Sequence, residues 1–170
     1  MCATFLALGS LLLAGRTAKS WAAALGDWLH APGFPLHVME PLLEEPLDLG
    51  GGVTLTSRSV PHTGESVAYS VEHAGRRLVY TGDTGEDLSL GAWAAGCDLL
   101  LTECSLPDFM PMTLHLTPSQ TGALAAAAAP GLLVVSHMYP PLEGIDLRAE
   151  LGARWAGPTV IATDGLVLDC

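Results

Sequence analysis

Apolar residues in this chain follow two patterns, alternation at every second position and short continuous runs. Alternation over residues 53–60 predicts a half-exposed β-strand. Residues 67–73 and 76–81 flank Ala74-Gly75 and predict a β-hairpin. Continuous apolar runs predict buried strands at residues 98–102 and 132–135 and a further strand at 160–163. A closing hairpin is expected through Asp164-Gly165 into Val167-Leu168.

Helices are predicted between these strands. Thr117 is a favourable N-cap, Pro118 fits the first helical position and Gln120 completes a capping box. An alanine-rich helix is therefore expected over residues 118–129. Shorter helices are expected near residues 87–95 and 146–155. Strands with intervening helices predict an α/β layered architecture.

The amino-terminal part is less regular. Residues 2–14 are nearly all apolar, but no basic residue precedes them and the run is too short to span a bilayer. We therefore expect a buried helix that continues to Trp28, and a cytoplasmic protein without a membrane segment. Residues 34–39 predict a short strand, and the Pro- and Gly-rich residues 40–52 predict a loop.

The composition fits a single domain over residues 1–170, because 49% of the residues are hydrophobic and no repeat or linker interrupts them. Acidic residues outnumber basic ones 18 to 7, which gives a formal net charge of −11. This charge disfavours extended nucleic-acid binding, although bound divalent ions would reverse the field locally. The four cysteines form no CxxC pair and are expected to be free thiols.

Chemistry-bearing residues follow several of the predicted strands. Residues 78–85, Leu-Val-Tyr-Thr-Gly-Asp-Thr-Gly, lead from a strand into a glycine turn that presents Asp83. His62 and His137 each follow an apolar or β-rich run and precede a loop. Imidazoles and carboxylates gathered at one sheet edge are ligands for a zinc-type ion. Plain alternatives stay open: Asp83 as a turn residue, and the histidines as core residues bonded to the backbone.

Four sequence elements occur in a characteristic order after residue 34. They are His62 with Ser66 and Tyr69, Tyr-Thr-Gly-Asp-Thr-Gly at 80–85, Leu-Leu-Leu-Thr-Glu-Cys at 99–104 followed by His-Leu-Thr at 115–117, and Ser-His-Met-Tyr-Pro at 136–140. Together they resemble the metallo-β-lactamase superfamily, in its ribonuclease Z-like branch. The resemblance implies the αββα sandwich known as the metallo-β-lactamase fold.

The resemblance also implies a metal-dependent hydrolase with two zinc ions, with Mn²⁺ as an alternative metal. Asp83 is expected to bridge the two ions, and His62 and His137 to bind one each. His115 is expected beside the substrate phosphate, where it orients the phosphate or protonates the leaving oxygen. Glu103 is expected to hold an imidazole in the required tautomer. Activated water is the nucleophile in such a site, so no nucleophilic side chain is needed.

Two departures from the family pattern change these expectations. The motif His-x-His-x-Asp-His is absent, so we expect an amino-terminally truncated domain that lacks the first β-half of the fold. His62, Asp83 and His137 alone cannot saturate two zinc ions, and weak metal binding with slow or no turnover is expected. In addition, only a tight hairpin separates His62 from Asp83, where tRNA-processing members often carry a long arm.

The expected reaction is phosphodiester hydrolysis, with a small diester or an RNA end as the substrate. Two alternatives stay open. One is thioester, lactone or arylsulfate hydrolysis with the same ligands. The other is a non-catalytic half-domain whose open sheet edge pairs with a partner, or with a second copy in a homodimer.

Overall fold

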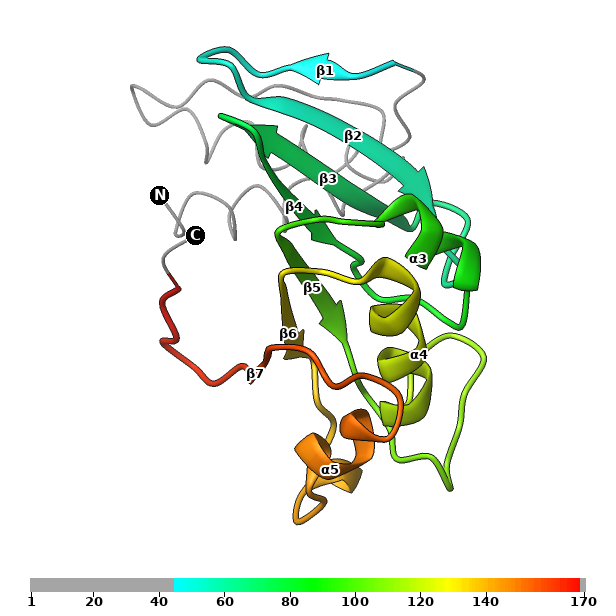
Figure 1. The fold of residues 1–170 in the computed structure, drawn as a ribbon. Helices are drawn as coiled ribbons and strands as arrows, with labels where there is room; N and C mark the ends of the chain where they lie inside the picture. Colours follow the sequence, from blue (N-terminus) through cyan, green and yellow to red (C-terminus); the bar gives the residue numbers. More distant parts are fainter. Residues whose placement is uncertain (1–44, 169–170) are drawn as a thin grey trace, which may run out of the picture.

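A seven-stranded sheet forms the centre of the fold in the computed structural model, which describes residues 45–168 (Figure 1). The strands lie side by side in chain order and are β1 (Leu47–Asp48), β2 (Thr54–Ser59), β3 (Val67–His73), β4 (Arg76–Tyr80), β5 (Leu99–Glu103), β6 (Leu132–Ser136) and β7 (Thr159–Ile161). The helical elements are α3 (Leu88–Trp93), α4 (Pro118–Ala128), the 3-10 turn η2 (Pro140–Leu142) and α5 (Leu147–Gly152). The predicted α/β architecture is confirmed.

The directions of the strands determine where the loops meet. Strands β1 to β4 pair antiparallel, and β4 to β7 pair parallel. Strand β2 therefore runs in the same direction as β4, β5 and β6. The carboxyl ends of these four strands lie at one edge of the sheet, which is where open α/β sheets bind their ligands.

The hairpin of β3 and β4 turns through Ala74 and Gly75, as the sequence predicts. Both residues have positive φ angles, 51° and 77°. Such angles are typical of the two-residue turn whose twist matches the flanking strands. The chain between β2 and β4 therefore consists of a short loop at residues 60–66, strand β3 and this two-residue turn.

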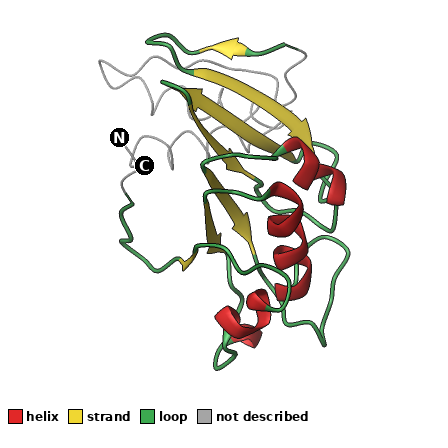
Figure 2. Ribbon diagram, in the orientation of Figure 1, coloured by secondary structure: helices red, strands yellow, loops and turns green. Residues whose placement is uncertain are grey.

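The helices cover one face of the sheet, and Figure 2 shows α3 and α4 lying side by side on it. Helix α4 begins with the predicted capping box of Thr117 and Gln120. Small residues allow α3 and α4 to pack closely, because a Cβ atom at Gly91 would lie only 2.6 Å from the Cβ atom of Ala127. The main core fills this layer with fully buried aliphatic side chains, among them Val79, Leu100, Leu116, Leu133 and Val135.

A second, smaller core cluster consists of Leu55, Val67 and Tyr69 on strands β2 and β3. In β3, Val67 and Tyr69 belong to this cluster, whereas Ala68 belongs to the core beneath the helices. Alternate residues of a strand point to opposite faces of the sheet. Both faces of β3 therefore carry buried apolar side chains.

Two of the expected elements are wrong. The predicted loop at residues 40–52 contains the short strand β1, which pairs with β2 through Leu47 and Asp48. The predicted closing strand at 167–168 does not form, since the chain leaves the turn at Asp164 and Gly165 without strand pairing up to residue 168. The predicted helix up to Trp28 and the strand at residues 34–39 lie outside the described residues. Between residues 45 and 168, no helix is long and apolar enough to cross a bilayer.

Candidate metal centre

The residues singled out in the sequence meet at the carboxyl edge of the sheet. His62 follows β2, Asp83 follows β4, Glu103 ends β5 and His137 follows β6 directly. His115 lies in the segment just before α4, which returns to the same edge. Four separate strand ends and one helix entry therefore deliver these five side chains to one region.

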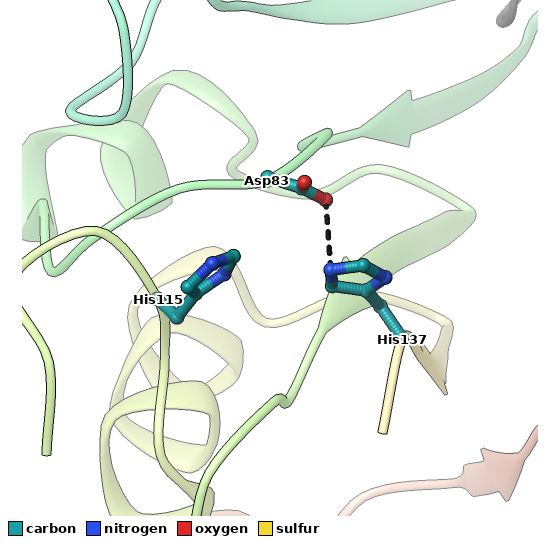
Figure 3. A group of neighbouring side chains, drawn as sticks. All are labelled: Asp83, His115 and His137. Carbon is teal, nitrogen blue, oxygen red and sulfur yellow. Dashed lines mark ion pairs between the residues drawn. The ribbon is translucent and has the colours of Figure 1, made fainter. Parts of the chain in front are cut away.

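Three of these side chains converge closely enough to hold one metal ion. One donor atom each from Asp83, His115 and His137 lies within 4.8 Å of the other two. Oδ1 of Asp83 lies 3.5 Å from Nε2 of His137, and Figure 3 shows these two side chains facing one another beside the His115 ring. Zinc–ligand distances are about 2.0–2.2 Å, so donor atoms at this spacing need to move inward by less than about 1 Å to bind one ion.

His62 lies next to this group rather than within it. Its ring centroid is 5.0 Å from that of His115, and its Nδ1 atom lies 2.9 Å from the carbonyl oxygen of Leu114. A carbonyl oxygen only accepts, so Nδ1 of His62 must carry the proton. The Nε2 atom of neutral His62 is then the nitrogen with a free lone pair, as a metal ligand requires.

Glu103 is a buried carboxylate that several donors hold in place. Its side chain is 1% exposed. It accepts hydrogen bonds from the backbone N–H groups of Thr84 and Leu116, at 2.6 and 3.2 Å, and from the hydroxyl of Ser105. Nδ1 of His115 lies 3.0 Å from Oε1 and 3.1 Å from Oε2. This pair fixes the His115 ring with Nε2 as its second, unengaged nitrogen.

Buried polar side chains are concentrated beneath this edge. They are Thr81, Thr84, Thr102, Glu103, Ser105, His115, Thr117 and Thr121. Most are paired, as buried polar groups must be, and the hydroxyl of Thr121 donates to the carbonyl oxygen of Glu103 at 3.1 Å. Burial, followed by the negative charges of Asp83 and Glu103, raises the pKa of Tyr80. Two carboxylates at one sheet edge favour a cation.

Gly85 is a point of very close backbone approach. The carbonyl oxygen of Thr113 lies 1.9 Å from the position that a Cβ atom would take, and the carbonyl oxygen of Pro61 lies 3.1 Å from it. The N–H of Gly85 also donates to Pro61 at 2.6 Å. Only glycine lets the loops that carry His62 and His115 approach the loop that carries Asp83.

His137 has an unusual backbone conformation. Its φ angle is +58°, in the left-handed region that non-glycine residues seldom occupy. This conformation turns the chain sharply as it leaves β6. Strained conformations of this kind are concentrated at functional sites.

Tyr139 is a site residue to which the sequence analysis assigns no role. Its ring centroid is 5.0 Å from that of His137 and 5.4 Å from that of His115. Its backbone N–H donates to the carbonyl oxygen of Ser105 at 3.1 Å, which fixes the loop after β6. The available signal was its place in Ser-His-Met-Tyr-Pro, two positions after His137.

The nearby cysteine offers no nucleophile. Burial raises the pKa of the Cys104 thiol to about 12, so the thiol is protonated at neutral pH. Cys97 and Cys104 are both free and buried, as predicted for these two cysteines. The edge therefore suits metal-assisted chemistry better than covalent catalysis by cysteine. One carboxylate and imidazoles with free Nε2 atoms are a donor set that zinc accepts.

Comparison with known proteins identifies related chains. The family described as the beta-lactamase superfamily domain matches residues 16–138. An uncharacterized protein of Mycobacterium leprae is 34% identical over 129 residues, which make up 74% of this chain and 45% of the relative. A ribonuclease Z of Bradyrhizobium diazoefficiens is 35% identical over 94 residues, which make up 53% of this chain and 31% of that enzyme. The chain thus spans less than half the length of these relatives.

Among solved structures, the metallo-beta-lactamase fold protein YhfI of Bacillus subtilis matches with a TM-score of 0.67 and 26% identity. The match covers 72% of this chain and 52% of YhfI. The sheet with its helical layer is therefore the arrangement found in proteins of that fold.

Proposed function

Since this chain belongs to the metallo-β-lactamase superfamily, we propose that it is a metal-dependent hydrolase that cleaves phosphodiester bonds. The observation that carries the proposal is the Glu103–His115 pair beside Asp83 and His137. It combines a group able to move a proton with groups able to hold a metal at one sheet edge.

Zinc is the proposed metal, and the ligands that the family resemblance implies for it are Asp83 and His137, which face one another, and His62, which lies beside the group. Bound zinc supplies Lewis-acid chemistry, which stabilises negative charge on a phosphoryl oxygen and lowers the pKa of water. In the two-zinc arrangement that the family resemblance implies, Asp83 would be a ligand of both ions. These three residues leave coordination positions open, so two ions need further ligands.

The proposed role of His115 is to protonate the leaving oxygen. Water would add to phosphorus as the ester P–O bond breaks and Nε2 of His115 gives its proton to the departing oxygen. One proton of the added water would then return to Nε2, so that the products are an alcohol and a phosphate monoester. Glu103 supports this step because its negative charge stabilises the protonated imidazole and its position keeps Nδ1 protonated. Both residues are buried, so the proton is held away from bulk solvent.

The ribonuclease Z relative favours a phosphodiester over other esters as the substrate. Two features of this chain favour a small phosphodiester over a folded RNA. Between His62 and Asp83 the chain forms only the end of a short loop, strand β3, a two-residue turn and strand β4, which leaves no segment for an RNA-binding arm. A net charge of −11 opposes a long polyanion. A small diester therefore fits better than a folded RNA.

The test uses the full chain freed of metal by a chelator and then supplied with Zn²⁺ or Mn²⁺. We expect hydrolysis of bis(4-nitrophenyl) phosphate only after metal is added, and its loss in Asp83→Ala. A thioester, a lactone and an aryl sulfate are assayed beside it. Turnover of these esters without turnover of the diester would replace the proposed substrate class.

A second candidate function is non-catalytic. It is favoured by the small number of ligands that residues 45–168 bring together. In that case the chain pairs with a partner or with a second copy, and no ester is cleaved at any metal concentration. Light scattering should then show a homodimer or a larger complex. The proposed enzyme, by contrast, should cleave the diester whatever its oligomeric state.

A further inference from the structure

The segment that joins Glu103 to His115 exposes an unusual number of apolar side chains. The exposed fractions are 80% for Phe109, 49% for Met110, 50% for Met112 and 40% for Leu114. Single exposed apolar residues are ordinary, but four of them within six residues of one segment point to a binding surface. We call residues 105–116, which carry these four side chains, the apolar loop.

The apolar loop is held in place at several points. At its base, the N–H groups of Ser105 and Leu106 donate to the carbonyl oxygen of Leu116. In its middle, Asp108 accepts hydrogen bonds from the N–H and hydroxyl of Ser119, at 3.1 and 2.7 Å. Near its end, Met112 pairs with His115. The exposed side chains are therefore presented by an anchored segment.

The apolar loop also leads directly into the site. Leu114 precedes His115, and its carbonyl oxygen accepts the hydrogen bond from His62. The carbonyl oxygen of Thr113 lies against Gly85, at the base of the loop that carries Asp83. The loop thus forms the side of the site next to His115.

The chemistry of the site decides which part of a substrate would lie there. The residue that protonates the leaving oxygen must be within hydrogen-bonding distance of that oxygen. We place the organic group attached to the leaving oxygen on the side of the apolar loop, because Thr113 and Leu114 of that segment border the site. Residues 105–116 contain no lysine or arginine, and their one carboxylate, Asp108, is engaged by Ser119. The segment therefore offers nothing to a further phosphate group.

From this arrangement we propose that the apolar loop selects phosphodiesters whose leaving group is an apolar or aromatic alcohol. The inference rests on the proposed function and names the substrate class of the same site. Its occupant is the leaving group itself, and Phe109 and Met112 are the specificity-determining residues that contact it.

The test measures binding of two phosphate monoesters to the zinc-loaded full chain by calorimetry. Phenyl phosphate and methyl phosphate share the phosphate group and differ in apolar surface. We expect phenyl phosphate to bind about tenfold more tightly, a ratio of the size that apolar pockets achieve. In Phe109→Ser/Met112→Ser the ratio of the two dissociation constants should fall to about one. The matched control is Leu49→Ser, because Leu49 is 42% exposed and lies beside the β1–β2 turn at the opposite sheet edge, and it should keep the ratio.

Each other outcome has a definite meaning. Equal binding of the two esters to the wild-type chain overturns the inference and leaves the proposed function standing. A ratio that persists in the double variant overturns it as well. If light scattering shows a wild-type dimer that the double variant dissociates, with the ratio unchanged, the apolar loop serves a second copy instead. Binding of Zn²⁺ without binding of either ester contradicts the proposed function, and the inference fails with it.

Discussion

Both carboxylate oxygens of Glu103 lie within hydrogen-bonding distance of Nδ1 of His115, at 3.0 and 3.1 Å. Glu103 lies just before the apolar loop and His115 lies near its end, so this contact also joins the two ends of the loop. A buried carboxylate in this position keeps the proton of the neutral imidazole on Nδ1 and stabilises the imidazolium form. The proposed proton transfer from Nε2 depends on it.

His115→Ala should slow the hydrolysis of diesters with poor leaving groups far more than that of activated diesters. A general acid contributes about 100-fold or more, and only where the leaving oxygen needs a proton. The measurement is kcat/KM for a series of diesters whose leaving groups differ in pKa. Glu103→Gln should show the same dependence with a smaller loss. Equal losses across the series would instead assign His115 to phosphate positioning.

Zinc affinity should separate the ligands from the proton donor. His62→Ala and Asp83→Ala each remove a proposed ligand, and we expect the dissociation constant of Zn²⁺ to rise more than about 100-fold, beyond the loss seen for outer-shell partners. His115→Ala should change it by less. Competition with a chromophoric chelator gives the values. A large loss in His115→Ala with little loss in His62→Ala would place His115 among the ligands, as the convergence of Asp83, His115 and His137 allows.

Gly85→Ala should destabilise the fold and misplace the site together. The new methyl group would meet the carbonyl oxygen of Thr113, which belongs to the backbone and has no flexible end to move aside. We expect a loss of about 2 kcal/mol in the free energy of unfolding, measured in urea, together with weaker zinc binding. Gly64→Ala is the control, since nothing lies within 4 Å of its Cβ position. An unchanged Gly85→Ala would show that the Pro61, Gly85 and Thr113 loops separate freely.

Acid stability should depend on the contact between Asp98 and Arg76. The hydrogen bond from the Arg76 guanidinium, with that from the Arg77 N–H, lowers the pKa of Asp98 from its ordinary value of 3.8. A lowered pKa adds stability above the unfolded value, which is lost as the pH falls through the folded value. Arg76→Ala should therefore lower the urea midpoint at pH 6, and the difference from wild type should shrink below about pH 4. A difference that grows towards low pH would contradict this assignment.

Elements with strong local signals were predicted closely from the sequence. Strands β5 and β6 are continuous apolar runs between turns, and α4 has its capping box. Strand β1 was missed because only Leu47 and Asp48 pair, within a stretch rich in Pro and Gly. The closing strand after Gly165 was predicted from apolar residues alone, but a strand also needs a partner. Pairing of this kind is a property of the fold rather than of the segment.

In the candidate site too, some positions could be predicted from local sequence signals and others depend on the fold. Asp83, Glu103 and His137 could be placed together because parallel strands end at one edge. The contact between His62 and the Leu114 carbonyl joins residues 52 positions apart through a backbone atom, which carries no side-chain signature. The position of Tyr139 against two imidazoles likewise depends on how the loop after β6 turns.

The left-handed backbone conformation of His137 lowers the stability of the fold, although the imidazole at this position is needed in the proposed metal site. Glycine adopts this conformation without the Cβ penalty of about 1–2 kcal/mol that other residues carry. His137→Gly should therefore be more stable than His137→Ala, although both lose the imidazole. Selection of variants for thermal resistance alone would enrich glycine here and discard the side chain that faces Asp83. The imidazole at this position thus comes at a cost in folding stability that glycine would not carry.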